Sequence, residues 1–288
     1  MSGIGHYLAR RYLTRMNARH VAQYPQVAGF AFDQITQFIH LDGRYERDQL
    51  DFLARRVFPT LPPGGICLDI GANIGNHSLA FAPHFTRVIA LEPHPRTFRL
   101  LQLNADLAPN VTPLNIGASD TAGVARVALD PLNYGASSIG KAAPADAAEV
   151  EFRLARLDEV AEIGTDLPVT FIKIDVEGHE AAALAGAEAT IRRNRPLIVI
   201  EVLPNEVSDG SSAAVEVLRS FGYRHFHELR EAGWLGRLPR NAKKAVRTLL
   251  TLLTGRRPSK AEALAEVSRL EKRSYPMLLC SMEPLALG

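Results

Sequence analysis

Apolar runs alternate with amphipathic stretches along most of the chain from residue 64 onward. The apolar runs are short and rich in β-branched residues, which predicts strands, and two of them, 169–174 and 197–202, are apolar enough to be buried on both faces. The stretches between them have helical spacing. This β-α-β alternation predicts an α/β fold with a mainly parallel, doubly wound sheet of the Rossmann-like class. We expect strands at 66–70, 88–91, 111–116, 169–174, 197–202 and 223–228, and helices at 76–82, 95–107, 178–193 and 211–221.

Other segments interrupt or flank this alternation. Residues 120–158 contain two stretches of alternating apolar and polar residues around a turn-rich segment, which predicts an inserted antiparallel strand pair or an ordered loop. We therefore divide the chain into a helical lead-in (1–40), an α/β domain (41–235) and a basic helical extension (236–288) that returns a final strand to the sheet.

A glycine-rich turn follows the first apolar run of this domain. The segment 64–83, GGICLDIGANIGNHSLAFAP, passes from a strand through this turn into a helix, and such a turn is the usual ligand contact of a parallel sheet. Gly71 and Gly75 permit positive φ angles and close ligand approach. Glu92 ends the next strand, where an acidic side chain can accept hydrogen bonds from both hydroxyls of a ribose. Together these residues indicate a ligand that contains adenosine.

The carboxylate of Asp69 distinguishes between two classes of cofactor. A dinucleotide places its pyrophosphate on a G-x-G-x-x-G turn, whereas this turn is G-x-x-x-G and follows a carboxylate that would repel phosphate. S-adenosylmethionine carries an ammonium and a sulfonium and has no phosphate. We therefore expect S-adenosylmethionine, bound by Asp69, Gly71, Asn73, Gly75 and Glu92. A nicotinamide-dependent oxidoreductase and a non-catalytic binding module are the alternatives.

The sequence resembles the FkbM-type methyltransferases, a family of S-adenosylmethionine-dependent enzymes. The resemblance covers roughly residues 41–225, and its most specific part is the pairing of DIGANIG at 69–75 with FIKIDVEGHE at 171–180. It implies a class I methyltransferase fold and O-methylation of a hydroxyl group on a sugar, glycan or natural-product intermediate. His77 and His179 depart from the family pattern, so the substrate side is expected to differ.

Candidate catalytic residues follow the strand that ends in FIKID. A hydroxyl acceptor has to lose its proton during methyl transfer, and a positioned general base contributes about 10²- to 10⁴-fold. The segment KIDVEGHE ends its strand at the same edge of the sheet as the glycine turn. His179 and Asp175 are the candidates for the general base, and an exposed histidine in the first turn of a helix is the alternative for His179. We expect Glu177 to bind acceptor hydroxyls, with a role at the helix amino terminus as its alternative. This short cluster predicts no metal site.

Further contacts are expected for adenine and for the acceptor. Past the third strand, Gly117 and Ala118 leave room for adenine, and their backbone groups can bind the ring. Tyr45 and Glu46, in a segment that resembles the family's upstream motif, are candidates to line the acceptor pocket, with packing as the alternative. Tyr134, in the turn-rich insertion, is a candidate substrate lid residue.

Composition limits the partners and the location. The net charge of +2 is too small to predict nucleic-acid binding. Cys67 and Cys280 lie inside apolar runs, which indicates buried thiols in a reducing compartment. The amino terminus lacks the apolar segment of a signal peptide, and no apolar run approaches the ~18 residues of a membrane span. We therefore expect a cytoplasmic protein with a small-molecule or glycan acceptor.

The carboxy-terminal extension has a basic, amphipathic pattern. Between residues 237 and 260 it contains basic residues and no acidic one. Within 240–257, leucines and other apolar residues follow helical spacing while the basic residues project from other faces, which predicts an amphipathic basic helix. Such a helix either packs on the α/β core or contacts an anionic membrane surface peripherally.

Overall fold

The computed structural model describes residues 3–128, 149–164, 167–232, 238–254 and 262–285. The chain forms two compact units. One consists of Met1–Leu53 and Leu229–Leu264, and the other of Ala54–Glu228 and Ala265–Gly288.

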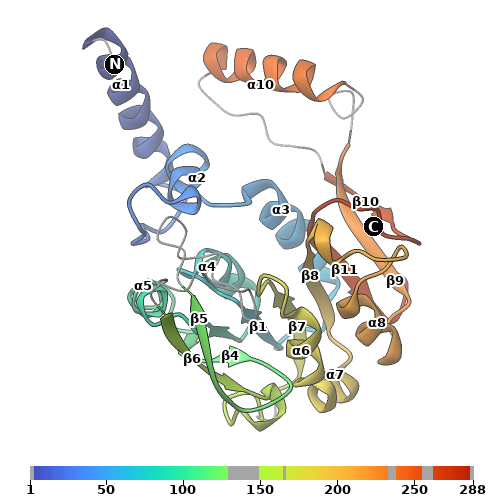
Figure 1. Cartoon of the computed structure of the whole chain (residues 1–288). Coiled ribbons are helices and arrows are strands. Elements are labelled where there is room, and N and C mark those ends of the chain that lie inside the picture. The colour runs from blue at the N-terminus through green and yellow to red at the C-terminus, as the bar shows by residue number, and fades with distance from the viewer. Residues whose placement is uncertain (1–2, 129–148, 165–166, 233–237, 255–261, 286–288) are drawn as a thin grey trace. The chain divides into compact units, whose positions relative to one another are not determined.

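An eight-stranded sheet has the strand order β10-β9-β11-β8-β7-β1-β2-β3 (Figure 1). The strands from β3 to β8 in this order are parallel, whereas β11 runs antiparallel to its neighbours β8 and β9. The order reverses between β1 and β7, the place where open α/β sheets bind ligands. The predicted mainly parallel, doubly wound sheet is confirmed. The strands are β1 (Ile66–Ile70), β2 (Arg87–Leu91), β3 (Val111–Leu114), β7 (Val169–Ile174), β8 (Leu197–Val202), β9 (His225–Glu231), β10 (Glu262–Glu266) and β11 (Tyr275–Ser281).

Apolar side chains cover both faces of this sheet, as expected for buried parallel strands. One face packs into a core with helices α6 to α8, to which alternate residues of β1 and β7 contribute. On the other face, Phe171 contacts the rings of Phe58, Phe81 and Phe85. The helices and short turns of this unit are α4 (Asn76–Phe81), α5 (Pro95–Ala105), α6 (Glu180–Ala185), α7 (Glu188–Asn194), α8 (Ala213–Ser220), η2 (Phe58–Thr60), η3 (Ala82–His84), η5 (Leu157–Glu159) and η6 (Pro204–Glu206).

The single helix expected over 178–193 is instead two helices, α6 and α7. They meet at Gly186, where a Cβ would lie 1.9 Å from the carbonyl oxygen of Ser119. The close approach of that distant segment requires glycine, and glycine weakens a helix at the same point.

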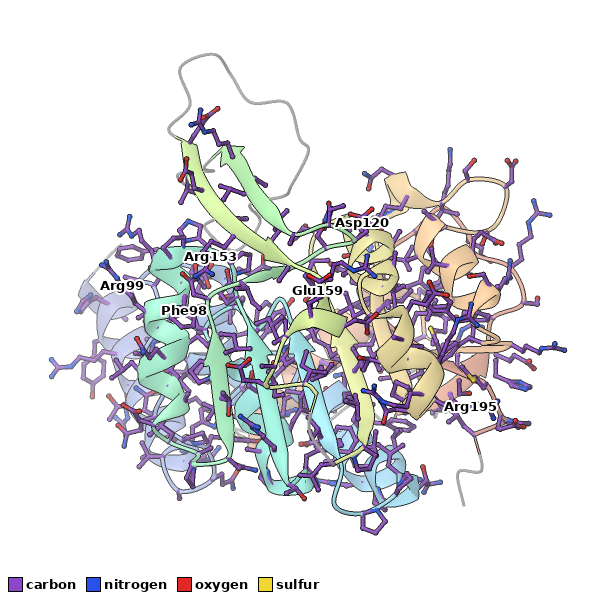
Figure 2. The ribbon with its side chains drawn as sticks, turned by 90° about the horizontal axis from the view of Figure 1, so that it is seen from below. Phe98, Arg99, Asp120, Arg153, Glu159 and Arg195 are labelled. Atoms are coloured by element: carbon purple, nitrogen blue, oxygen red, sulfur yellow. The ribbon has the colours of Figure 1, made fainter. Side chains whose placement is uncertain are left out.

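A smaller sheet has the order β4-β6-β5. Strands β5 (Gly123–Ala128) and β6 (Glu149–Ala155) pair antiparallel, and β4 (Gly117–Ala118) pairs parallel with β6. Figure 2 shows the β5–β6 pair extending away from the strands of the larger sheet. The antiparallel pair predicted within 120–158 is therefore confirmed.

The other unit contains the helices from both ends of the chain. They are α1 (Gly3–His20), α2 (Gln34–Asp42), α3 (Arg47–Phe52) and α10 (Arg240–Thr254), and the π-helical turn η1 (Leu53–Val57) follows α3. Asp33 caps α2 by accepting hydrogen bonds from the N–H groups of Ile35 and Thr36. Within the described ranges, none of the helices has both the length and the apolar character needed to cross a membrane.

Candidate functional site

The pairing of β1 with β7 brings together the residues at the centre of the site. The pairing shifts by one residue between Ile66 and Cys67, so that Asp69 lies opposite Lys173. Opposed residues on neighbouring strands point to the same face of a sheet. Without the shift, Asp69 would lie opposite Ile172, and Lys173 would point to the other face. The irregularity therefore brings an acidic and a basic side chain together near the carboxyl edge.

Lys173 is buried and connects two carboxylates to the glycine turn. Its Nζ lies 3.4 Å from Asp69 Oδ1 and 3.3 Å from Asp175 Oδ2. The same atom donates a 3.0 Å hydrogen bond to Gly71 O. Asp69 is also buried and accepts a 2.6 Å hydrogen bond from the Ser78 hydroxyl on α4. The carboxylates offset the cost of burying the ammonium group, so each partner depends on the other.

The sequence predicts that Asp69 faces a positively charged ligand. In the structure, the cation beside Asp69 is Lys173, and the Asp69 side chain is fully buried. No described residue donates a hydrogen bond to its Oδ1. The ion pair thus gives Asp69 a structural role, and a direct contact with a cofactor stays a prediction.

The five backbone N–H groups of the turn 71–75 all donate to acceptors within the protein. Three of them donate to the carbonyl oxygens of Leu91 and Ala72. The fourth donates to Asn73 Oδ1 and the fifth to Glu92 Oε2. A phosphate-binding turn needs N–H groups that are free to point at the ligand. The arrangement of this turn therefore favours a ligand without phosphate.

Packing also requires the two glycines of this turn. Gly71 has a φ of 76°, and a Cβ there would lie 1.9 Å from the carbonyl oxygen of Asp175. Gly75 has a φ of 90°, and a Cβ there would lie 2.9 Å from Leu101 Cδ1. Both glycines keep the turn close to its neighbours, and their contact with a cofactor stays a prediction.

Glu92 follows β2 with both carboxylate oxygens oriented by backbone groups. Oε1 accepts a 2.8 Å hydrogen bond from the N–H of His94, and Oε2 accepts one of 3.0 Å from the N–H of Asn73. Each carboxylate oxygen can accept two hydrogen bonds, so each retains an acceptor position that fits a ribose hydroxyl. Burial raises the pKa of Glu92 to about 7, and the two N–H groups counteract only part of that rise.

The segment after β3 lies close to Glu92. Asn115 Nδ2 donates hydrogen bonds of 2.9 and 3.1 Å to the carbonyl oxygens of Glu92 and Pro93, which gives Asn115 a structural role. A Cβ on Gly117 would lie 3.3 Å from Pro93 Cβ, so this side of Gly117 is already filled. Binding of adenine by Gly117 and Ala118 stays a prediction.

The Glu180 carboxylate orders the loop between β7 and α6. It accepts 3.0 Å hydrogen bonds from the N–H groups of Val176 and Gly178. Glu177, between them, has a φ of 55° in the left-handed region, and Gly178 follows with a φ of 100°. Non-glycine residues in this conformation cluster at functional sites, where surrounding contacts hold them in place. The loop therefore presents Glu177 from a constrained backbone.

Asp175 and Glu201 form a pair of carboxyl groups. Lys173 lies opposite Val199, and the same register continued by two residues places Asp175 opposite Glu201. The charge of each carboxyl group disfavours ionisation of the other. Burial and the charge of Asp175 raise the pKa of Glu201 well above its usual range. Burial alone would raise the pKa of Asp175, but Lys173 lowers it, so Asp175 ionises more readily than Glu201.

His179 precedes α6 and lies beside the segment that follows β4. Its Nε2 is 3.0 Å from Oγ of the buried Ser119. Burial lowers the pKa of His179, and the charge of Asp120 opposes this shift only in part. The imidazole is therefore neutral at pH 7, as a general base must be. Asp175 lies next to Lys173 instead, so the two base candidates have different surroundings.

The structure does not test the predicted acceptor contacts Tyr45, Glu46 and Tyr134. Tyr45 and Glu46 belong to the other compact unit, where the Tyr45 and Phe38 ring centroids are 5.8 Å apart and Glu46 precedes α3 with a φ of 52°. Tyr134 lies outside the described residues. Acceptor binding by these three residues stays a prediction.

Several residues of the site received no functional role from the sequence. Lys173 and Glu201 had a usable signal, because ionisable residues inside the apolar runs FIKID and LIVIEV need partners when buried. Ser78 had none. Asn104 donates a 2.7 Å hydrogen bond from Nδ2 to Ile74 O, which attaches α5 to the glycine turn.

Among the described residues, no three or more His, Cys, Asp or Glu side chains are arranged to hold a metal ion.

Comparison with known proteins adds a family and two curated relatives. The sequence model of the methyltransferase FkbM domain matches residues 69–230, more than half of the chain. Hexuronic acid methyltransferase AglP from Haloferax volcanii is 34% identical over 119 residues, which are 41% of this chain and 48% of that protein. AMB antimetabolite synthetase AmbE from Pseudomonas aeruginosa is 29% identical over 247 residues, covering 71% of this chain and 11% of that protein. The matched regions thus span less than half of either relative.

Solved structures include a protein described as methyltransferase FkbM from Methylobacillus flagellatus. It is 20% identical and has a TM-score of 0.37, with 69% of this chain and 49% of that chain covered.

Proposed function

Because this chain belongs to the methyltransferase FkbM family, we propose that it transfers a methyl group from S-adenosylmethionine to a hydroxyl group on a sugar or glycan. Glu92, Asp175 and the turn 71–75 are grouped at the carboxyl edge beside the β1–β7 reversal, which supports ligand binding there. The similarity to a hexuronic acid methyltransferase supports a sugar acceptor.

The pairing of Glu92 with the glycine turn is the observation that carries the cofactor proposal. Glu92 retains an acceptor position on each oxygen for a ribose, while the five N–H groups of the turn are already used. This combination favours an adenosine without phosphate over the pyrophosphate of a nicotinamide dinucleotide. When bound, S-adenosylmethionine supplies an electrophilic methyl group on a positively charged sulfur.

The protein has to position the acceptor hydroxyl and accept its proton. We assign proton transfer to His179 or Asp175, since the neutral imidazole and the ionised carboxylate can both accept a proton. Burial and the charge of Asp175 raise the pKa of Glu201, which favours its protonated form beside Asp175. Glu177 binds neighbouring hydroxyls of the acceptor from its constrained loop.

The charge at this edge also bears on the acceptor. Asp69 and Asp175 both face a single buried ammonium, that of Lys173. This excess of carboxylates favours a positively charged cofactor and disfavours an acceptor with a carboxylate of its own. We therefore expect neutral sugars to be better acceptors than uronic acids.

Ligand-dependent thermal unfolding and labelled methyl transfer test the proposal. S-adenosylhomocysteine should raise the melting temperature and NAD should not, because only a ligand of the folded state stabilises it. Labelled methyl groups should reach methyl glucoside more readily than the matching glucuronide. Stabilisation by NAD alone would favour the oxidoreductase. Stabilisation by S-adenosylhomocysteine without transfer to any hydroxyl acceptor would favour the binding module.

A further inference from the structure

A pocket of about 490 Å³ lies at the opposite edge of the larger sheet. It forms where α7 ends before β8 and where β9 begins beside the end of β11, which is the amino edge of β8. Figure 2 shows Asp120 and Arg195 at opposite ends of the α6 and α7 helices. Because β8 is six residues long, about 20 Å separates this pocket from the carboxyl edge.

Basic side chains dominate the lining of this pocket. Arg192, Arg195, Arg224 and His225 line it, with one carboxylate, that of Glu283, among the described lining residues. Arg195 and Arg224 are exposed, and neither forms an ion pair with a described residue. The pocket therefore has two guanidinium groups available for an anion.

Arg192 is fixed in position by three neighbours, and one of its Nη2 N–H groups donates a 3.4 Å hydrogen bond to Ser220 O. Its Nε donates a 2.7 Å hydrogen bond to Glu188 Oε1. Its guanidinium carbon lies 4.9 Å from the centroid of the Phe221 ring. The planar group is thus held at the pocket wall, with other N–H groups left to donate.

A buried hydrogen bond joins the backbone segments that carry the other two arginines. The hydroxyl of Tyr223, next to Arg224, donates a 2.6 Å hydrogen bond to the carbonyl oxygen of Pro196, next to Arg195. The N–H of Arg224 also donates to Ser281 O at 3.1 Å. Arg195 and Arg224 therefore extend from backbone positions that are fixed relative to one another.

We propose that this pocket binds the phosphate or pyrophosphate group of a soluble ligand. A guanidinium group presents a planar fork of donors that matches two phosphate oxygens. Several guanidinium groups on different segments suit a phosphate, which presents oxygens on every side. A carboxylate presents only one pair of oxygens. The volume is within the range of small-molecule sites, and the fixed backbone limits the entropy lost on binding. The proposal does not depend on methyl transfer.

Isothermal titration calorimetry of the full chain with inorganic pyrophosphate tests this site. We expect saturable binding that weakens as the NaCl concentration rises. The double variant Arg195→Asn with Arg224→Gln should bind roughly tenfold more weakly or worse. Asparagine suits position 195, where φ is 49°. Arg193→Gln is the matched control, because Arg193 is an exposed arginine of α7 that does not line the pocket.

Thermal unfolding of each variant separates a loss of binding from a loss of folding. Retained binding by Arg193→Gln and lost binding by the folded double variant would support the proposal. No saturable binding by the wild type, or equal binding by the wild type and the double variant, would overturn it. An equal loss in Arg193→Gln would also overturn it, because general surface charge would then explain the binding.

Discussion

Lys173 is the residue on which the candidate site most depends. It is buried, and its ammonium group contacts two carboxylates and the carbonyl oxygen of Gly71. These contacts join β1, β7 and the glycine turn. Removing the charge would leave Asp69 buried without its cation, which is more costly than the loss of a surface ion pair.

Replacing Lys173 with methionine is expected to lower the free energy of unfolding by about 3–5 kcal/mol, because the uncompensated Asp69 stays buried. Urea unfolding followed by circular dichroism measures the change. The double variant Asp69→Asn with Lys173→Met should recover part of the loss, since it also removes the isolated charge. A double variant that is no more stable than Lys173→Met would contradict this pairing.

The pKa of Glu92 predicts that cofactor affinity depends on pH. Ribose hydroxyls donate to the ionised carboxylate, so S-adenosylhomocysteine should bind more tightly as the pH rises through about 7. Glu92→Gln should weaken binding roughly tenfold or more and remove this part of the pH dependence. Calorimetry across this pH range measures both effects. The same pH dependence in the wild type and the variant would exclude Glu92 as its source.

His179→Ala is expected to lower kcat by about 10²- to 10⁴-fold with little change in cofactor affinity, because a general base acts in the transition state. Steady-state kinetics and calorimetry measure the two quantities. Ser119→Ala is the control, since it removes the hydroxyl beside Nε2 and keeps the imidazole. If Asp175→Asn lowers kcat and His179→Ala does not, Asp175 is the base.

At the scale of elements, α10 has both a partner and an exposed apolar position. Arg247 lies 2.5 Å and Lys243 3.7 Å from the Glu231 carboxylate at the end of β9. These ion pairs attach the helix within its own unit. Leu249 is 56% exposed, and exposed leucines on a basic helix are typical of helices that bind membrane surfaces. The peripheral membrane contact predicted for 240–257 thus stays a proposal.

Leu249→Glu is expected to reduce sedimentation of the full chain with anionic vesicles at low salt, because it places a negative charge where the helix would meet the surface. Leu103→Glu is the matched control, since Leu103 on α5 is also 56% exposed. Truncation after residue 236 is less informative, because it also removes β11 from between β8 and β9. Wild-type protein that stays in the supernatant would favour packing as the role of α10.

At the scale of the whole molecule, the larger unit separates two local charges of opposite sign. Carboxylates gather at the carboxyl edge of the parallel strands, and arginines surround the pocket at the amino edge. The net charge of +2 conceals this separation, because it sums 33 basic and 31 acidic residues over the whole chain. Local fields, rather than net charge, therefore decide which ligands each edge attracts.

Local sequence patterns were sufficient to predict the main elements and the edge of the site. The bounds predicted for β1, β7 and β8 are those of the structure, because short apolar runs and the turns that end them depend on neighbouring residues. The acidic residues Asp69, Glu92 and Asp175 lie near or beyond strand ends, so their common edge could also be predicted.

Only the tertiary structure decided which residues become partners. The irregularity between Ile66 and Cys67 places Asp69 opposite Lys173, and the β7–β8 register places Glu201 beside Asp175. These partners come from strands far apart in the chain. A slip of one residue would turn a side chain to the other face, and register depends on how whole strands pack. No local pattern contains that information, which is why the sequence predicted the site's edge but not its ion pairs.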